Sequence, residues 1–235
     1  MTVPEFAPGL TVRGFTPPLA LIDFGLIAFD MDSTLINIEC VDEIADFAGR
    51  KAEVAALTEA AMRGEIADYD ESLRQRVALL AGLDAAVLER VWNERLSLAP
   101  GARQLVAGVR AAGLRTLLVS GGFTFFTERL QAQLGLDETR ANTLEIVGGR
   151  LTGRLVGGIV NAQAKRTALE DACARLGCTP AQAIAVGDGA NDLEMMASAG
   201  LSVAYRAKPQ VAAQATHTIA HCGLDAILHF FAPGS

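Results

Sequence analysis

The sequence is poor in the features that mark membrane and secreted proteins. Its apolar runs are short and are broken by Asp, Arg or Gly, so we expect no membrane partner. The N-terminal stretch lacks the basic start and apolar run of a secretory signal, which makes a cytoplasmic location the default expectation. The four cysteines are scattered and form no CxxC pair, so we expect reduced thiols rather than a disulfide framework.

Lysine is scarce as well, with three in 235 residues, and the formal net charge is −7. Because nucleic acids are held by clusters of Lys and Arg, we expect no nucleic-acid partner. An anionic substrate would need positive charge supplied locally, by a metal ion or by a few well-placed cations. The hydrophobic content of 51% is enough for a sizeable core, either as one large domain or as a core with a smaller insert.

The order of apolar patterns predicts an α/β fold. Residues 26–30 have the continuous apolar pattern of a buried strand, and residues 39–95 carry apolar side chains at helical spacing. From residue 100 onward helices and strands alternate, which is typical of a doubly wound, mainly parallel sheet. A β-hairpin is expected to turn at 148–149. We therefore predict an irregular N-terminal arm at 1–20, a catalytic core formed by 21–38 and 100–235, and an inserted helical-bundle cap at 39–99.

Polar or glycine-rich turns follow three of the expected strands, where α/β sheets form their sites. They read DMDST at 30–34, SGG at 120–122 and GDGAND at 187–192. Taken singly, the first could be an Asp-rich turn that caps a helix, and the second is a common turn. The third is more specific, because it gathers Asp188, Asn191 and Asp192 around two glycines. With Lys165 at a helix start between the second and third turns, the ordered set is a strong signal.

This ordered set resembles the haloacid dehalogenase-like superfamily of phosphatases, over nearly the whole chain from Leu26 to Phe231. The resemblance implies a nucleophilic Asp30 that forms an aspartyl-phosphate, with Asp32 acting first as acid and then as base. Mg²⁺ would offset the charge of a phosphate dianion. Its hard oxygen ligands would be the carboxylates of Asp30 and Asp188, and the backbone carbonyl of Asp32 is added only by the resemblance.

The same resemblance assigns the binding of the phosphoryl group. Ser120, the backbone N–H of Gly121, Lys165 and Asn191 would hold its oxygens and stabilise the spreading charge. Asp192 would orient the metal's surroundings rather than bind the metal directly. In a chain so poor in lysine, Lys165 supplies the local positive charge that an anionic substrate requires.

The insert resembles the cap of phosphoserine phosphatases, which bears on the substrate. Glu39 would pair with a substrate ammonium, and Arg76 would bind its carboxylate through the guanidinium fork. Taken singly, Glu39 could be a carboxylate favoured in a first helical turn, and Arg76 could belong to a solvated helix face. Met62 and Tyr69 would form an apolar lid. The chain departs from the family here, because it has one extra residue between Met62 and Ser72, and the family usually has a large apolar residue at the position of Tyr69.

We therefore predict a Mg²⁺-dependent phosphatase that acts on phosphoserine in the last step of serine biosynthesis. Its partner would be a small phosphomonoester, and it would work as a monomer or a homodimer. Two alternatives share this chemistry: a phosphotransferase that passes the phosphoryl group to an alcohol such as homoserine, and a phosphatase for another small phosphomonoester. A catalytically inactive binding protein is disfavoured, because a binder needs no nucleophile.

Overall fold

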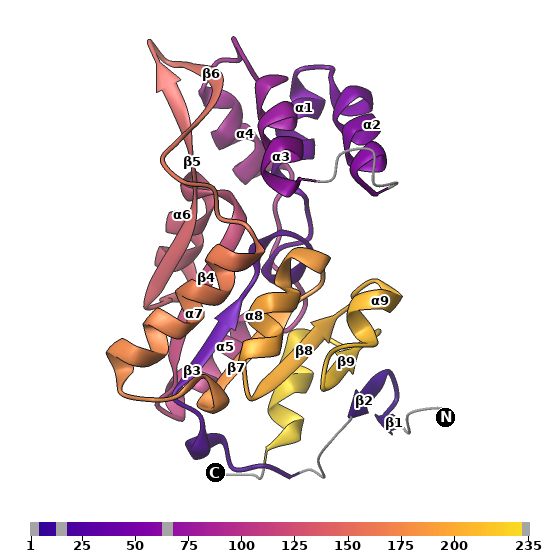
Figure 1. Ribbon diagram of the computed structural model, residues 1–235, viewed down its shortest axis with the longest axis vertical. Coiled ribbons are helices and arrows are strands. Elements are labelled where there is room, and N and C mark those ends of the chain that lie inside the picture. Colours follow the sequence, from indigo (N-terminus) through magenta and orange to yellow (C-terminus); the bar gives the residue numbers. More distant parts are fainter. Residues whose placement is uncertain (1–4, 13–17, 63–67, 232–235) are drawn as a thin grey trace.

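The computed structural model describes residues 5–12, 18–62 and 68–231, without the side chains of 5–7 and 58–62. A nine-stranded sheet lies at the centre of these residues, in the order β1-β2-β9-β8-β7-β3-β4-β5-β6 (Figure 1). The strands from β9 to β5 run parallel, and β2 and β6 pair antiparallel at the two ends. The strands are β1 (Glu5–Ala7), β2 (Leu10–Val12), β3 (Leu26–Phe29), β4 (Arg115–Phe123), β5 (Glu138–Val147), β6 (Arg150–Val156), β7 (Ala183–Gly187), β8 (Leu201–Tyr205) and β9 (His217–Ile219). This confirms the predicted α/β fold with a mainly parallel sheet.

Helices cover both faces of the parallel strands, so these strands are apolar on both sides. In β3, Ile27 and Phe29 belong to the core that includes the apolar side chains of α5 (Ala102–Ala111) and α6 (Thr124–Leu134). Leu26 and Ala28 belong to a second core with α7 (Ala162–Leu176) and α8 (Leu193–Ser198). The short helix α9 (Pro209–Ala212) follows β8. None of the described helices is long and apolar enough to cross a membrane.

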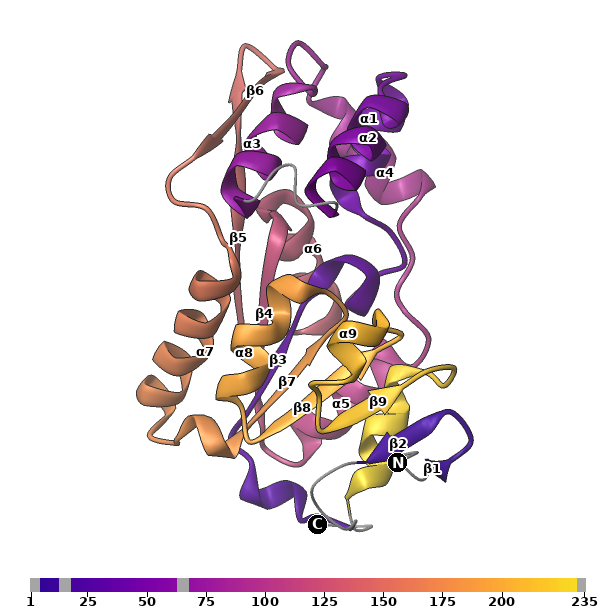
Figure 2. The same cartoon turned by 45° about the vertical axis from the view of Figure 1, so that its right-hand side comes forward.

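Four helices gather beyond the carboxyl end of β3, and we call residues 40–94 the helical insert (Figures 1 and 2). They are α1 (Cys40–Phe47), α2 (Lys51–Met62), α3 (Tyr69–Ala78) and α4 (Ala86–Glu94). The β5–β6 hairpin turns at Gly148 and Gly149, as expected, and its tip reaches this insert. The Gly82 N–H donates to the carbonyl of Leu151 at 2.8 Å, and the Arg150 guanidinium donates to the carbonyl of Gly82 at 2.7 Å.

The expectation of an irregular arm at 1–20 is wrong for two segments. β2 pairs antiparallel with β9 and so extends the sheet, and β1 pairs with β2. Leu10 is buried in the core that includes Phe29. Strands of three residues are too short to show an alternating pattern, and what holds β2 in place is the edge of β9, a strand some two hundred positions away in the sequence.

Candidate active site

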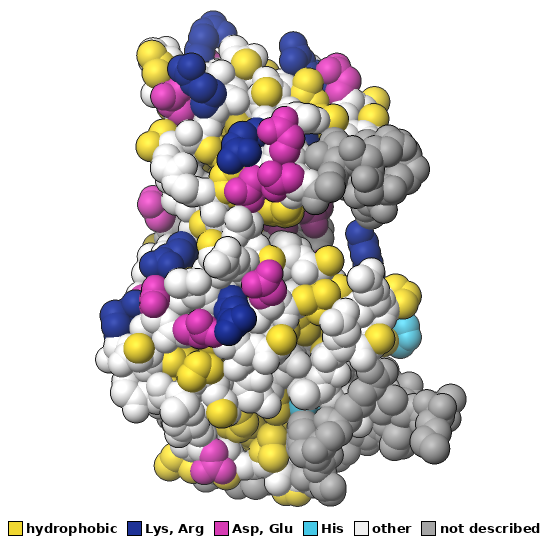
Figure 3. Space-filling view, viewed as in Figure 1, with side chains coloured by type: hydrophobic (Ala, Val, Ile, Leu, Met, Phe, Trp, Pro, Cys, Tyr) yellow, Lys and Arg dark blue, Asp and Glu magenta, His cyan; other side chains and the backbone are white. Residues whose placement is uncertain are grey.

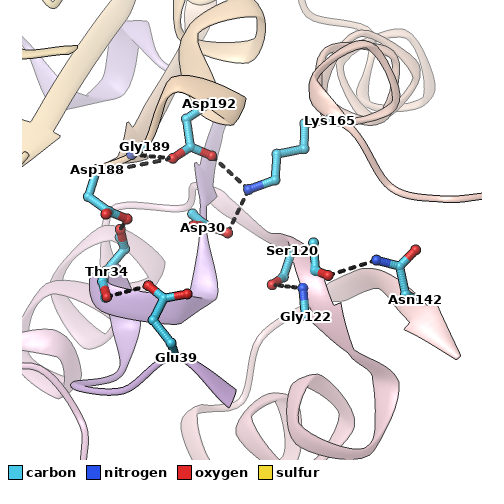
Figure 4. A network of polar contacts seen from close by, with 12 residues as sticks. Asp30, Thr34, Glu39, Ser120, Gly122, Asn142, Lys165, Asp188, Gly189 and Asp192 are labelled. Carbon is cyan, nitrogen blue, oxygen red and sulfur yellow. Dashed lines mark hydrogen bonds and ion pairs between the residues drawn. The ribbon is translucent and has the colours of Figure 1, made fainter. Parts of the chain in front are cut away.

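The carboxyl ends of β3, β4 and β7 bring the predicted turns together (Figure 4). Asp30 follows β3, Ser120 lies near the end of β4, and Asp188 follows β7. Lys165 reaches the same place from the first turn of α7. Asn161 caps that helix, because its side chain accepts a hydrogen bond from the N–H of Ala164 at 3.0 Å.

Lys165 is fully buried between two carboxylates. Its Nζ lies 2.6 Å from Oδ1 of Asp30 and 2.7 Å from Oδ1 of Asp192. Burial lowers the pKa of Lys165, but the two carboxylates outweigh it and raise the pKa well above its usual value. The ammonium therefore stays charged, and it fixes the orientation of the Asp30 side chain.

Asp30, Asp188 and Asp192 form an acidic cluster in which one carboxylate oxygen of each lies within 4.8 Å of the others. Burial, and then the charge of Asp192, raises the pKa of Asp188 to about 7. When all three carboxylates are ionised, they exceed the charge of the one ammonium by two. Hard oxygen donors with this excess charge fit a divalent cation such as Mg²⁺.

Asp188 and Asp192 differ in how many hydrogen-bond donors their carboxylates already have. Asp192 accepts backbone N–H bonds from Asp188 and Gly189 at 3.1 and 3.0 Å, in addition to the bond from Lys165. Both carboxylate oxygens of Asp192 therefore already have hydrogen-bond donors. This agrees with the prediction that Asp192 orients the metal's surroundings and does not bind the metal directly. Asp188 accepts one hydrogen bond, at 2.9 Å, from the hydroxyl of Thr34, a contact that sequence reasoning missed.

Asp32 lies beside the cluster with a strongly shifted pKa. Burial, and then the charge of Glu39, raises the pKa of its carboxyl to about 8, while the Cys40 N–H donates to Oδ1 at 3.3 Å. A carboxyl that holds a proton at neutral pH can act as a general acid. A Cβ on Gly122 would lie 2.8 Å from Oδ2 of Asp32, so this close approach requires glycine.

Asn142 on β5 holds the Ser120-Gly121-Gly122 turn in place, and sequence reasoning missed it. Its Nδ2 donates to the carbonyl of Gly121 at 2.7 Å, and its Oδ1 accepts from the N–H of Val160 at 2.8 Å. Ser120 is fully buried, and its Oγ accepts the Gly122 N–H at 2.8 Å. A single Asn inside a strand pattern gives no signal of this role, because its partners come from two other segments.

Glu39 and Arg76 lie close enough to act on each other, as the predicted substrate clamp requires. The Ser33 hydroxyl donates to Oε1 of Glu39 at 2.7 Å from a backbone with φ of +55°. Burial raises the pKa of Glu39 above its usual value. The hydrogen bond from Ser33 and the charge of Arg76 offset part of this rise. Arg76 is half-buried, and its Nε donates to the carbonyl of Ser72 at 3.4 Å. Sequence reasoning missed the role of Ser33.

Of the remaining predicted site residues, the structure describes the side chains of Tyr69 and Asn191 but not that of Met62. Tyr69 opens α3, and its hydroxyl lies against Gly121, where an added Cβ would overlap it. Asn191 lies in a short turn, η4 (Ala190–Asp192), where its Oδ1 packs against Gly189. Met62 ends α2, and its side chain lies outside the described residues.

Comparison with known proteins identifies the family. Residues 27–197 match the family model of haloacid dehalogenase-like hydrolases. A protein of Polaromonas sp. (strain JS666), named phosphoserine phosphatase, is 62% identical over 228 residues, which cover 95% of this chain and 97% of the relative. The chain belongs to the phosphoserine phosphatase family of haloacid dehalogenase-like hydrolases. The resemblance seen in the sequence is thereby confirmed, and the chain is an enzyme that hydrolyses phosphomonoesters.

Other members of the phosphoserine phosphatase family agree in sequence and in structure. The phosphoserine phosphatase of Albidiferax ferrireducens is 61% identical over 97% of this chain and 98% of its own. A solved structure of a phospho-aspartyl intermediate analogue of phosphoserine phosphatase is 37% identical, with a TM-score of 0.83 over 89% of this chain and 99% of that one. A substrate-bound phosphoserine phosphatase complex gives the same values.

Proposed function

We propose that the enzyme hydrolyses O-phospho-L-serine to L-serine and phosphate, as the last step of serine biosynthesis. The observation that carries the proposal is the pair of opposite charges, Glu39 and Arg76, beside the carboxyl groups of Asp30 and Asp32. A substrate with an ammonium and a carboxylate matches this pair of charges, and its phosphate would lie at the two aspartates, the proposed nucleophile and acid. Two relatives named phosphoserine phosphatase support this assignment. They are 62% and 61% identical to this chain.

The reaction takes place in two steps at the two aspartates. A carboxylate oxygen of Asp30 attacks phosphorus and forms an aspartyl-phosphate, and the ester oxygen of serine leaves with the proton of Asp32. Asp32, now a carboxylate, then takes a proton from the water that hydrolyses the intermediate. The pKa of about 8 supports this exchange, because both protonation states of Asp32 lie within reach of neutral pH.

The acidic cluster supports Mg²⁺ as the cofactor. The carboxylates of Asp30 and Asp188 and the backbone carbonyl of Asp32 would hold it, with Asp192 orienting their surroundings. When bound, Mg²⁺ supplies positive charge that offsets the repulsion between the substrate dianion and the Asp30 carboxylate.

The phosphoryl oxygens are bound by Ser120, the Gly121 N–H, Lys165 and Asn191. Three of these residues are held by the protein before substrate arrives. Lys165 is fixed by two ion pairs, Ser120 is fixed by the Gly122 N–H, and the Gly121 backbone is fixed by Asn142. Donors fixed in advance cost little reorganisation during the reaction, which favours the charge distribution of the transition state.

The helical insert acts as the cap domain, within the predicted boundaries 39–99. Glu39 pairs with the substrate ammonium and Arg76 with its carboxylate, while Met62 and Tyr69 form the lid. On the face seen in Figure 3, basic side chains lie next to acidic ones, which does not favour a nucleic-acid partner. A cytoplasmic enzyme that works as a monomer or a homodimer stays a prediction.

A panel of phosphomonoesters tests the proposal. With Mg²⁺ present, we expect phosphoserine to lead in kcat/KM by at least two orders of magnitude over esters without an amino-acid head, because two charge-assisted contacts are lost with the head (roughly 1.5–3 kcal/mol each). Equal rates across the panel would overturn the substrate assignment. With homoserine present, phosphate released in a smaller amount than serine would show that the enzyme transfers the phosphoryl group.

Arg76→Gln tests the clamp, with Arg74→Gln as the matched control. Arg74 lies on the same helix with its side chain 55% exposed, and its ion pairs with Asp70 and Glu71 are 3.9 and 3.8 Å long. We expect Arg76→Gln to reduce kcat/KM for phosphoserine at least tenfold and to leave para-nitrophenyl phosphate unaffected. Arg74→Gln should leave both substrates within twofold of the parent enzyme.

A further inference from the structure

The hydroxyl of Tyr69 lies inside the active site, against the turn that is proposed to bind the phosphoryl group. A Cβ added to Gly121 would overlap the Tyr69 hydroxyl oxygen, so the phenol oxygen contacts the Gly121 backbone directly. The charges of Lys165, Arg76, Asp30 and Asp32 all act on this phenol, with that of Lys165 the strongest. The tip of the side chain is therefore at the phosphoryl end of the site, and the lid role of Tyr69 does not account for it.

This hydroxyl is a proton donor without a partner in the described part of the chain. The structure records no hydrogen bond of the Tyr69 hydroxyl to any described residue. Burial raises the pKa of Tyr69 to about 12, so the phenol stays protonated at neutral pH and can donate. The Tyr69 side chain is half-buried, so its hydroxyl can donate to a ligand that binds beside Gly121.

The position of Tyr69 is fixed by a contact between the helical insert and the core. Asp70, the next residue of α3, accepts a hydrogen bond at 3.0 Å from Nδ2 of Asn161. Asn161 is also the N-cap of α7, the helix that carries Lys165. The start of α3 and the start of α7 are thereby tied together, which sets the distance between the phenol and the phosphoryl-binding residues.

We propose that the Tyr69 hydroxyl donates a hydrogen bond to a phosphoryl oxygen of the substrate, beside the Gly121 N–H. Tyr69 is then a catalytic residue of this chain, since it touches the reacting group, in addition to being part of the lid. The inference rests on the proposed function for the location of the phosphoryl group. It does not depend on which phosphomonoester is the substrate, because the group contacted is the phosphoryl group itself.

The test is Tyr69→Phe, which removes the hydroxyl and keeps the ring. We expect kcat/KM to fall about tenfold or more on both phosphoserine and para-nitrophenyl phosphate, the loss for one hydrogen bond to a charged group. The inhibition constant of inorganic phosphate should rise by a similar factor, and that of L-serine, which has no phosphoryl group, should stay within twofold. The midpoint of thermal unfolding without ligand should not fall, because no bond within the protein is lost.

The matched control is Tyr205→Phe, which removes the second tyrosine hydroxyl of the chain. Tyr205 is 1% exposed on β8, and its hydroxyl likewise has no hydrogen-bond partner among the described residues. We expect this variant to keep parental kcat/KM and parental inhibition by phosphate.

Two results would overturn the inference. One is a Tyr69→Phe enzyme within twofold of the parent on both substrates, with phosphate inhibition unchanged. The other is a loss on phosphoserine alone, which would place the hydroxyl at the amino-acid head. If the parent enzyme prefers another ester, the proposed function fails, but the phosphate and para-nitrophenyl phosphate measurements still test Tyr69.

Discussion

Replacement of Lys165 by Met is the sharpest test of the site's electrostatics. The substitution removes the ammonium and keeps a side chain of similar length at a position with no exposed surface. Asp30 and Asp192, whose Oδ1 atoms lie 2.6 and 2.7 Å from Nζ, then stay buried without their counter-charge. We expect the variant to lose activity and also to unfold more easily without Mg²⁺.

The size of the loss follows from the two ion pairs. At an effective dielectric constant near 20, each contact is worth about 6 kcal/mol of attraction before the cost of desolvation. Desolvation offsets much of this, and removal of one partner of a buried pair typically destabilises a protein by about 3–5 kcal/mol. For a chain of this size that corresponds to a fall of roughly 10 °C in the unfolding midpoint.

Urea unfolding followed by circular dichroism, in chelator, measures this change. Lys51→Met is the matched control, because Lys51 pairs with Glu43 at 3.3 Å with its side chain 51% exposed. We expect the control to lose less than about 1 kcal/mol. Mg²⁺ should stabilise Lys165→Met more than the parent, since the variant leaves an additional negative charge to be offset.

The result that would refute this reasoning is a Lys165→Met enzyme within about 1 kcal/mol of the parent in chelator. It would mean that the carboxylates carry no charge in the folded protein without metal. Equal stabilisation of both proteins by Mg²⁺ would likewise contradict the charge count of the acidic cluster.

Three further predictions concern groups around the site and in the core. Burial lowers the pKa of His217 from 6.5 to about 4, so its contribution to stability is lost as pH falls from 6.5 to 4. In urea unfolding, the free energy of unfolding at pH 5 should be about 2 kcal/mol lower than at pH 7, and His217→Gln should abolish this loss. The prediction is refuted if the variant loses as much stability between pH 7 and pH 5 as the parent. Ser33→Gly should raise KM for phosphoserine several-fold through the lost bond to Glu39, without lowering thermal stability, because glycine favours φ of +55°; a parental KM would contradict this. Asn142→Leu should cost about 2–4 kcal/mol and lower kcat, because it unpairs the Gly121 carbonyl, and parental kcat would count against its positioning role.

Several elements could be predicted from sequence because their causes are local. The continuous apolar pattern of 26–29 predicts a buried strand, helical spacing predicts the insert, and paired glycines predict the hairpin turn. Short strands are the exception. β1 and β2 were missed because three residues show no periodicity, and their pairing depends on the edge of β9.

In the site too, local motifs could be predicted from the sequence, and contacts between distant segments could not. By itself the sequence predicted candidates for the nucleophile, the acid, the cation and the acidic turn, because each stands at a strand end or a helix start within a motif that resembles the family's. Only the tertiary structure showed that Ser33 holds Glu39, that Asn142 holds Gly121, and that the Tyr69 hydroxyl reaches that same glycine. These contacts depend on side-chain direction and on elements far apart in the chain, and neither is encoded in the spacing of residue types.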